Sequence, residues 1–385
     1  MYRLALRILF ADRTRYFMLV SGTAFCTLLV IQQSSVFCGI MSWTFAVLNN
    51  SRAPIWVMDP KVEQVNDPRP MRDVELDAVR SVPGVAWAQP LFFSSSQAKL
   101  ADASFKMVQL IGIDSSTLIG APIHLVQGRL QDLRLPDTIL IDQFGQERLS
   151  FGYEDEAGRP RMLRLGDSIE LNNHQVRIVG ICRVSRPVAG GPYIYTTFQR
   201  AIEFARPSRH SLSFVLASPE PGEDPRVVAA RIAEQTGLQA MDEFTFRWRT
   251  LLWFVANTGI PAAFGTTVSL GVIVGIVITA QTFFSFVAEN SRSLAAFKAM
   301  GAPDKLLLRM TLFQALVASF IGYGIGLGLS AAFGYAVLPR GHIPFILLPH
   351  VVVGVLVIAL GISLGSAFLA GLRILRLEPD SVFRS

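Results

Sequence analysis

The chain has 385 residues, of which 51% are hydrophobic and 17% are charged. Ordinary soluble domains carry roughly 25% charged residues, so the composition argues against a soluble enzyme. The formal net charge is +6. Because the excess positive charge flanks apolar segments, it indicates membrane topology and requires no nucleic-acid partner.

Four long segments contain no Asp, Glu, Lys or Arg. They lie between Arg15 and Arg52, Arg249 and Glu289, Arg309 and Arg340, and Arg340 and Arg373. Each exceeds the roughly 20 apolar residues needed to cross a bilayer, so we expect membrane-spanning helices at 17–40, 264–288, 306–338 and 350–372. The first could be a cleaved signal peptide, but it is longer than a typical apolar signal core and no A-x-A-like site closes it, which favours a retained helix.

The basic residues lie mostly on one side of these helices. Residues 41–256 hold 23 Lys and Arg against 24 Asp and Glu, whereas the rest of the chain holds 12 against 5. Eleven of those twelve lie before the first predicted helix, between the second and third helices (Arg309 included) or after the fourth helix, and only Arg340 lies on the other side. By the positive-inside rule, the amphipathic N-terminus (1–16), the loop 289–305 and the tail 373–385 are cytoplasmic, and 41–256 is extracytoplasmic.

The segment 41–256 has a soluble composition and an α/β pattern. Periodicity predicts a first half with a strand, a helix and two strands at 55–58, 73–81, 85–98 and 106–113. It predicts a second half with a strand, a helix and a strand at 211–217, 225–236 and 239–246. The insert between them, about 120–204, is rich in Gly and Pro and has strand-like runs at 138–141, 168–171, 176–181 and 193–196. We therefore expect a large α/β domain with a β-rich insert.

No arrangement of catalytic or metal-binding residues is visible in this domain. His124, His174 and His210 are scattered, and the motifs H-E-x-x-H, G-x-S-x-G and C-x-x-C are absent. The acidic run at 154–156 lies between glycines, which favours a solvated turn over a cation site. The loop Gly190-Gly191-Pro192 is likewise expected to be a turn. The sequence thus predicts no catalytic residue, cofactor or metal site.

The three cysteines predict no disulfide within the chain. Cys26 and Cys38 lie about 18 Å apart along one predicted helix, too far to bridge. Cys182 is the one cysteine of segment 41–256.

Glycines in the third and fourth spans have spacings that allow close helix packing. The pairs Gly322 and Gly326, and Gly361 and Gly365, each place small residues four positions apart. Such faces let helix backbones approach in lipid, so we assign both pairs to packing within one copy of the chain. A moving helix interface is the alternative interpretation, because glycine also eases bending.

The loop between the second and third spans predicts a short amphipathic helix. Leu294, Phe297 and Met300 recur at helical spacing, and Gly301 followed by Pro303 ends the pattern. On this pattern alone, the helix could lie in the lipid interface or contact another protein.

This loop resembles the corresponding loop of FtsX/MacB/LolE-type ABC permeases. In that family the loop opens with an acidic and a basic residue, which are followed by Ile or Leu and then Ala. A basic residue comes next, and the sequence Ala-Leu/Met-Gly-Ala closes the loop. The matching residues are Glu289, Arg292, Leu294, Ala295, Lys298, Ala299, Met300, Gly301 and Ala302. Ser293 departs from the family, where an acidic residue is common. The order of one helix, outer domain and three helices also matches, as does the tail with Arg376, Pro379 and Arg384. Stand-alone DevC-like permeases are the nearest subgroup.

The resemblance implies a fold and a mode of action. The fold is an α-helical membrane protein with four transmembrane helices and a large extracytoplasmic α/β domain between helices 1 and 2, with porter-like β-α-β halves. Family members dimerise chiefly through helices 1 and 2 and place the helix 2–3 loop on an ATPase, which implies a coupling role for Glu289, Arg292, Leu294, Phe297, Lys298, Met300, Gly301 and Ala302. No G-x-x-x-x-G-K-[ST] motif occurs, so ATP and Mg²⁺ belong to a separate ATPase chain.

The favoured function is an ABC permease subunit of the bacterial inner membrane that transmits ATP-driven movement to its outer domain for export or extraction of a lipid-like or other substrate. The resemblance also implies a second copy and a periplasmic membrane-fusion protein as partners, besides membrane lipid. One alternative is a regulator of a cell-wall hydrolase or sensor with the same fold. Another is a receptor or enzyme that the helices only anchor.

Overall fold

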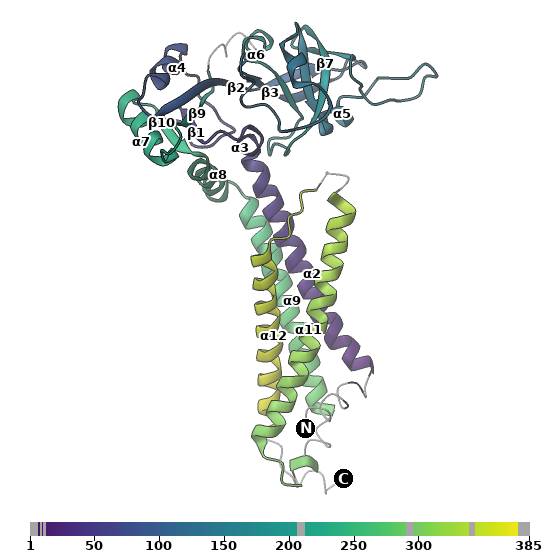
Figure 1. Cartoon of the computed structure of the whole chain (residues 1–385). Helices are drawn as coiled ribbons and strands as arrows, with labels where there is room; N and C mark the ends of the chain where they lie inside the picture. The colour runs from purple at the N-terminus through teal and green to yellow at the C-terminus, as the bar shows by residue number, and fades with distance from the viewer. Residues whose placement is uncertain are drawn as a thin grey trace. The chain divides into compact units, whose positions relative to one another are not determined.

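The computed structural model describes residues 7, 10, 13–205, 212–289, 296–298, 300–338 and 343–375 (Figure 1). The chain forms two compact units. The helical unit comprises Met1–Ile40 and Gly259–Ser385, and the α/β unit comprises Met41–Thr258. The extracytoplasmic segment expected at 41–256 falls within the α/β unit.

Four long helices among the described residues build the helical unit. They are α2 (Arg13–Thr44), α9 (Ile260–Glu289), α11 (Asp304–Val337) and α12 (Pro349–Leu375). Their stretches long and apolar enough to span a membrane are Tyr16–Thr44, Ile260–Ser285, Asp304–Val337 and Pro349–Leu372. The four spans predicted from the uncharged segments are therefore confirmed as helices. A helix suits such a segment because it satisfies all of the backbone hydrogen-bonding groups in lipid.

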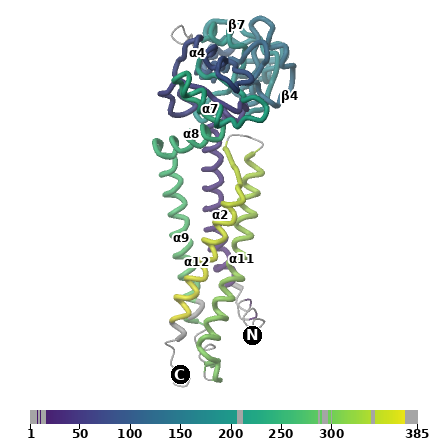
Figure 2. The backbone as a smooth tube through the Cα atoms, turned by 60° about the vertical axis from the view of Figure 1, so that its left-hand side comes forward, coloured from purple at the N-terminus to yellow at the C-terminus, as the bar shows by residue number. Residues whose placement is uncertain are grey.

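Apolar side chains from all four helices meet inside the helical unit, where the helices run side by side (Figure 2). One cluster combines Val30 and Ile31 of α2 with Val355 of α12 and Tyr323 of α11. The Tyr323 hydroxyl donates a hydrogen bond of 2.8 Å to the carbonyl of Val352. A second cluster joins α2, α9, α11 and α12 through Leu19, Val20, Phe283, Leu307, Ala315, Ala318, Ala367 and Ala370.

A ten-stranded sheet runs through the α/β unit in the order β10-β1-β9-β2-β3-β8-β5-β7-β4, with β6 paired to β2 and β7 off this path. The strands are β1 (Ile55–Met58), β2 (Val85–Lys99), β3 (Phe105–Ile113), β4 (His124–Gly128), β5 (Thr138–Asp142), β6 (Ser168–Leu171), β7 (His174–Arg183), β8 (Tyr193–Thr197), β9 (Phe214–Pro219) and β10 (Gln239–Asp242). The helices are α3 (Ala46–Ser51), α4 (Asp73–Arg80), α5 (Gln143–Arg148), α6 (Phe198–Phe204), α7 (Pro225–Thr236) and α8 (Glu243–Asn257), and a 3-10 turn, η1, covers Leu130–Arg134.

The two predicted β-α-β halves are present, as β1-α4-β2 and β9-α7-β10. Helix α7 begins where predicted because the Asp224 carboxylate accepts a hydrogen bond of 2.8 Å from the backbone N–H of Arg226 and Pro225 occupies the first turn. It ends at Gly237, whose φ of 72° is left-handed. The first residue of the strand expected at 211–217, Ser211, lies outside the described residues.

The insert contains both strands and helices. The strands expected at 138–141, 168–171, 176–181 and 193–196 correspond to β5, β6, β7 and β8, and the sequence missed β4, α5 and α6. Strand β3 pairs in parallel with β8, and β2 pairs antiparallel with β6. The insert therefore extends the sheet of the two halves.

The strand predicted at 239–246 is wrong beyond Asp242. Strand β10 ends at Asp242, whose carboxylate accepts a hydrogen bond of 3.3 Å from the backbone N–H of Thr245 and begins α8. The chain starts a helix here and does not continue the strand, because an aspartate followed by a periodic apolar segment favours a helix start.

The two faces of β1 pack against different helices of the α/β unit. Ile55 and Val57 pack with α4 and α7, whereas Trp56 and Met58 pack with α3 and with Phe246 of α8. This alternation follows the two-residue repeat of a strand. Helices α3 and α8, which adjoin the first and second spans in the chain, therefore share one apolar core.

Candidate functional site

A helical turn between α9 and α11 ends at Gly301. Residues 296–298 are helical, and Gly301 has a φ of +90°. The backbone N–H of Ala302 donates to the carbonyl of Phe297, and that of Gly301 donates to the carbonyl of Lys298, both at 3.0 Å. This is the Schellman arrangement, in which glycine supplies the left-handed residue after the helix. Gly301 thus ends the turn, as the sequence predicts.

The structure separates the residues of the proposed ATPase-coupling segment. Phe297 and Ala302 pack against the cluster that contains Leu19, Phe283 and Leu307, whereas Met300 is 73% exposed. Among the described residues of the segment, Met300 therefore presents exposed apolar surface, and Phe297 packs against the core of the helical unit.

Of the charged members of the segment, Lys298 lies within this turn and Glu289 lies at the end of α9. Lys298 forms an ion pair of 3.1 Å with Asp304, the first residue of α11. Glu289 is exposed at the end of α9. Arg292 and Leu294 lie outside the described residues, as do Arg376, Pro379 and Arg384 of the tail.

The two glycine pairs differ in their surroundings. A Cβ on Gly322 would lie 2.7 Å from Cβ of Thr23, and a Cβ on Gly326 would lie 2.5 Å from the carbonyl oxygen of Ala24. This pair therefore packs α11 directly on α2. At Gly361 and Gly365 an added Cβ would meet no atom of the described chain within 4 Å, so the packing within one copy that we expected for this pair is not observed.

Close packing of α2 on α9 is a feature that the sequence reading missed. A Cβ on Gly22 would lie 2.6 Å from Cγ2 of Ile278, and one on Gly275 would lie 2.7 Å from Cβ of Cys26. The available signal was the pair Gly271 and Gly275, which has the same four-residue spacing. The first two spans are therefore held together by small residues within one copy.

The last residues of α2 and the whole of α3 belong to the α/β unit. Helix α2 extends to Thr44, whose carbonyl accepts a hydrogen bond of 2.6 Å from Nδ2 of Asn66. After Phe45, helix α3 buries Val47 and Leu48 completely. It ends at Arg52, which has a left-handed φ of 44°, a conformation that costs a residue with a side chain roughly 1–2 kcal/mol.

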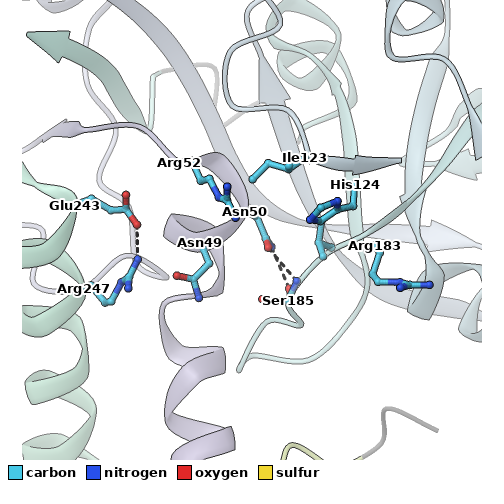
Figure 3. A pocket seen from close by; sticks show the side chains of 10 residues that line it. Asn49, Asn50, Arg52, Ile123, His124, Arg183, Ser185, Glu243 and Arg247 are labelled. Carbon is cyan, nitrogen blue, oxygen red and sulfur yellow. Dashed lines mark hydrogen bonds and ion pairs between the residues drawn. The ribbon is translucent and has the colours of Figure 1, made fainter. Parts of the chain in front are cut away.

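A polar cavity of about 740 Å³ lies beside α3 in the α/β unit (Figure 3). Its lining residues are Asn49, Asn50, Arg52, Ile123, His124, Arg183, Val184, Ser185, Glu243 and Arg247. Asn50 points at Ser185: its Nδ2 donates to the Ser185 carbonyl, and its Oδ1 accepts from the Ser185 N–H, each at 3.0 Å. Glu243 and Arg247 form an ion pair on α8. The cavity thus brings together the end of α3, the segment after β7 and the start of α8.

Two buried ionisable groups of the insert, Asp142 and Cys182, have structural explanations. Asp142 accepts hydrogen bonds from the backbone N–H groups of Gly145, at 2.5 Å, and Tyr193, at 3.2 Å. Burial raises the pKa of Asp142 to about 6, against the opposing effect of these hydrogen bonds. Burial also raises the pKa of Cys182. An N-cap carboxylate and a protonated buried thiol explain these residues without chemistry on a substrate.

No group of three or more His, Cys, Asp or Glu side chains that could hold a metal ion occurs among the described residues. In the acidic run, Asp155 accepts hydrogen bonds from the backbone N–H groups of Ala157 and Arg159 and pairs with the Arg159 side chain at 2.9 Å. The run therefore forms a turn whose central carboxylate binds its own backbone. Cys26, Cys38 and Cys182 are free thiols.

The sequence matches two family models. The model described as "MacB-like periplasmic core domain" matches residues 17–235, and the model described as "FtsX-like permease C-terminal" matches residues 265–379. Uncharacterized ABC transporter permeases of Mycobacterium bovis and Mycobacterium tuberculosis are 25% identical to the chain over 260 residues. That alignment covers 67% of this chain and 64% of each relative, which is less than two thirds of the relatives' own length.

Two solved structures are similar to part of the chain. The extracellular domain of the noncanonic ABC-type transporter YknZ from Gram-positive bacteria has a TM-score of 0.34 and 16% identity, and covers 49% of this chain and 98% of that one. The periplasmic region of MacB from Actinobacillus actinomycetemcomitans has a TM-score of 0.38 and 13% identity, and covers 54% of this chain and 95% of that one.

Proposed function

Since the chain belongs to the family of ABC transporter permeases with a MacB-like periplasmic core domain and an FtsX-like C-terminal domain, we propose that it transmits movement from a separate ATPase to its α/β unit. The family implies an ATPase partner. In this proposal the partner binds ATP and Mg²⁺, and the movement drives export or extraction of a lipid-like or other exported substrate.

The continuity of the first span carries this proposal. Helix α2 runs without interruption from Arg13 to Thr44, and α3 follows after one residue with Val47 and Leu48 fully buried. Because an α-helix is hydrogen-bonded from residue to residue along its length, displacement of one end of α2 is passed to the other. The buried α3 then transfers that displacement to the core of the α/β unit.

The proposed orientation follows from charge. Eleven of the twelve basic residues outside 41–256 lie on the side of the termini and of the loop between α9 and α11. The positive-inside rule places that side in the cytoplasm of the bacterial inner membrane and the α/β unit outside. The ATPase then meets the segment around Met300.

The proposed assembly contains two copies of the chain. We expect the copies to meet through α2 and α9, with an ATPase beneath each and a periplasmic membrane-fusion protein beside the α/β units. Helix α9 supports this arrangement, because only 17% of its membrane-spanning window is buried inside one copy, against 44% for α2. Paired cysteines along α9 should crosslink between copies, whereas efficient crosslinking through α11 and α12 would contradict the arrangement.

The contact with the ATPase is tested by Met300→Asp. A charge at this exposed position should leave the helical unit folded but weaken ATPase binding at least tenfold, because the carboxylate would be buried without a partner in the contact. The measurement is co-purification of the ATPase with the detergent-solubilised full chain, together with ATPase activity.

Two control variants make the result interpretable. Met300→Leu keeps the apolar contact and should restore binding. Ile343→Asp introduces the same charge at another exposed apolar residue, beyond the far end of α11, whose 34 residues span about 50 Å at 1.5 Å per residue. Unchanged ATPase binding in Met300→Asp, or an equal loss in Ile343→Asp, would show that Met300 does not contact the ATPase.

A further inference from the structure

Helix α8 exposes a stripe of large apolar side chains. Phe244, Trp248, Leu252 and Val255 are 62%, 54%, 52% and 41% exposed. Their spacings of four, four and three residues place them within an arc of about 80° at 100° per residue. We call these four side chains the α8 stripe. A contiguous exposed apolar surface of this kind usually marks a contact with a membrane or another molecule.

The opposite face of α8 is already buried. Phe246 and Thr250 are fully buried and Phe254 is nearly so, and Phe246 belongs to the core formed with β1 and α3. A surface helix of a soluble domain needs one apolar face, whereas α8 has two.

Side-chain hydrogen bonds fix the rotation of α8 about its axis. Nε1 of Trp253 donates to the Glu63 carboxylate at 2.7 Å, and Nη2 of Arg249 donates to the Val62 carbonyl at 3.1 Å. The Thr250 hydroxyl accepts from the backbone N–H of Val65 at 3.3 Å. Because these contacts hold the buried face in place, the α8 stripe stays on the surface of the α/β unit and is not turned into its core.

The chain itself limits what can cover the stripe. Helix α8 ends at Asn257, and α9 begins at Ile260. Three Cα–Cα steps of about 3.8 Å keep these two residues within about 11 Å of each other. The stretch of α9 that is long and apolar enough to span a membrane begins at Ile260, so the chain ties the end of α8 to within that distance of the start of this stretch.

The link between the helices allows α8 to take a direction different from that of α9. Thr258 has extended backbone angles, with φ −120° and ψ 155°, and at Gly259 an added Cβ would meet no described atom within 4 Å. A helix of 15 residues is about 22 Å long. If it lies along the membrane surface, all four side chains of the stripe reach lipid.

We propose that α8 is an interfacial helix whose stripe inserts into the lipid at the membrane surface adjoining the start of α9. The sequence of the helix fits this surface. Trp248 contributes an aromatic ring of the kind enriched at membrane interfaces, and the stripe is bordered by Arg247 and Arg249, whose aliphatic stems can lie along lipid. The bilayer completes the apolar burial that the protein leaves open on this helix.

The proposal is independent of the ATPase and concerns the depth of the α/β unit at the membrane. The test uses spin labels on the full chain reconstituted in phosphatidylcholine vesicles, after replacement of Cys26, Cys38 and Cys182 by alanine. One label is placed at Leu252→Cys on the stripe. The matched control is Val227→Cys on α7, another exposed apolar position of the α/β unit, and Ile276→Cys on α9 gives the reference for lipid exposure.

The label at 252 should resemble the label at 276, with high accessibility to oxygen and at least fivefold lower accessibility to a water-soluble nickel chelate than the label at 227. Accessibility to the chelate equal to that at 227 would place the stripe in water. Low accessibility to both reagents, with spin–spin broadening, would place a second copy of the chain on it. Either result overturns the proposal.

A second measurement needs no new cysteine. Brominated phosphatidylcholine should quench the part of the tryptophan emission that Trp248→Phe removes. If that part of the emission is not quenched in the otherwise unmodified chain, Trp248 does not touch lipid, whatever the labelled variants show.

Discussion

The α/β unit is joined to its first and second membrane spans in different ways. On the first side, α2 remains helical to Thr44 and is followed after one residue by the buried helix α3. On the second side, α8 stops at Asn257, and Thr258 is extended before α9 begins. The first connection is nearly continuous helix, whereas the second contains a break in backbone direction.

This difference assigns different mechanical roles to the two spans in the proposed mechanism. A continuous helix transmits both translation and rotation, because each turn is hydrogen-bonded to the next. A two-residue link in which Thr258 leaves the helical conformation interrupts the run of helical hydrogen bonds, so it transmits the pull of the chain but little rotation. Helix α2 therefore drives the α/β unit, and the link at Thr258 and Gly259 lets the unit follow.

The largest expected effect comes from inserting two alanines after Ile40, inside α2. The insertion rotates everything beyond it by about 200° and shifts it by about 3 Å, so the α/β unit should lose its response to ATP. The response is measured as the ATP-dependent change in distance between spin labels at Met162→Cys in the α/β units of two copies.

The same two alanines inserted after Gly259 provide the matched control. This position adjoins a break in the helix, so at least half of the distance change should remain, and membrane insertion should be normal in both variants. Equal loss of the response in the two variants would remove the distinction between the connections.

Packing of α11 on α2 should contribute to the stability of the driving helix. Gly326→Leu places its side chain against the Ala24 carbonyl and Thr27, and overpacking of this kind should lower the free energy of unfolding by roughly 3 kcal/mol. Gly365→Leu is the control, because an added Cβ there meets no described atom within 4 Å. Reversible unfolding in mixed micelles measures both variants, and an equal change in the two would argue against α11 as the support of α2.

The connection of α3 to the insert should have a smaller effect. Asn50→Ala removes both hydrogen bonds to Ser185 and leaves backbone groups without their partner, at a cost of about 2 kcal/mol in unfolding free energy. Asn49→Ala is the neighbouring control, since Asn49 lines the same cavity whereas both hydrogen bonds to Ser185 come from Asn50. If Asn50→Ala unfolds like Asn49→Ala, this connection does not fix the end of the first span.

The smallest effect is expected where the second connection is altered without steric conflict. Gly259→Ala adds a Cβ into open space and favours helix by up to about 1 kcal/mol, so stability should change little while the link stiffens. The ATP-dependent change in distance between the labels at Met162→Cys should become smaller but persist. Complete loss of that change would mean that the link needs more freedom than an alanine permits.

The sequence predicts the spans and most strands because their signals are local: uncharged runs of sufficient length, and the alternation that gives β1 its two apolar faces. It extends the strand at Gln239 as far as Phe246 and misses α8, because the apolar pattern continues past Asp242 and the helix start depends on the Asp242 cap. Periodicity also places Phe297 and Met300 on one predicted face. Their separation depends on which neighbouring helices reach Phe297, and a single segment carries no information on that.

The glycine pairs show the same limit. Gly322–Gly326 and Gly361–Gly365 have identical spacing, yet the first pair faces α2 and the second faces no described atom. A small-residue motif indicates that another helix can approach closely. Which helix approaches is decided by the arrangement of the whole helical unit.

The central claim, that ATP hydrolysis on one side of the membrane moves the α/β unit on the other, is tested most directly by the label pair at Met162→Cys in the reconstituted complex. The account predicts that the distance distribution between the two copies shifts on addition of ATP and does not cycle back when the ATPase carries a hydrolysis-blocking substitution. An unchanged distribution in a complex that hydrolyses ATP at its full rate would contradict the account.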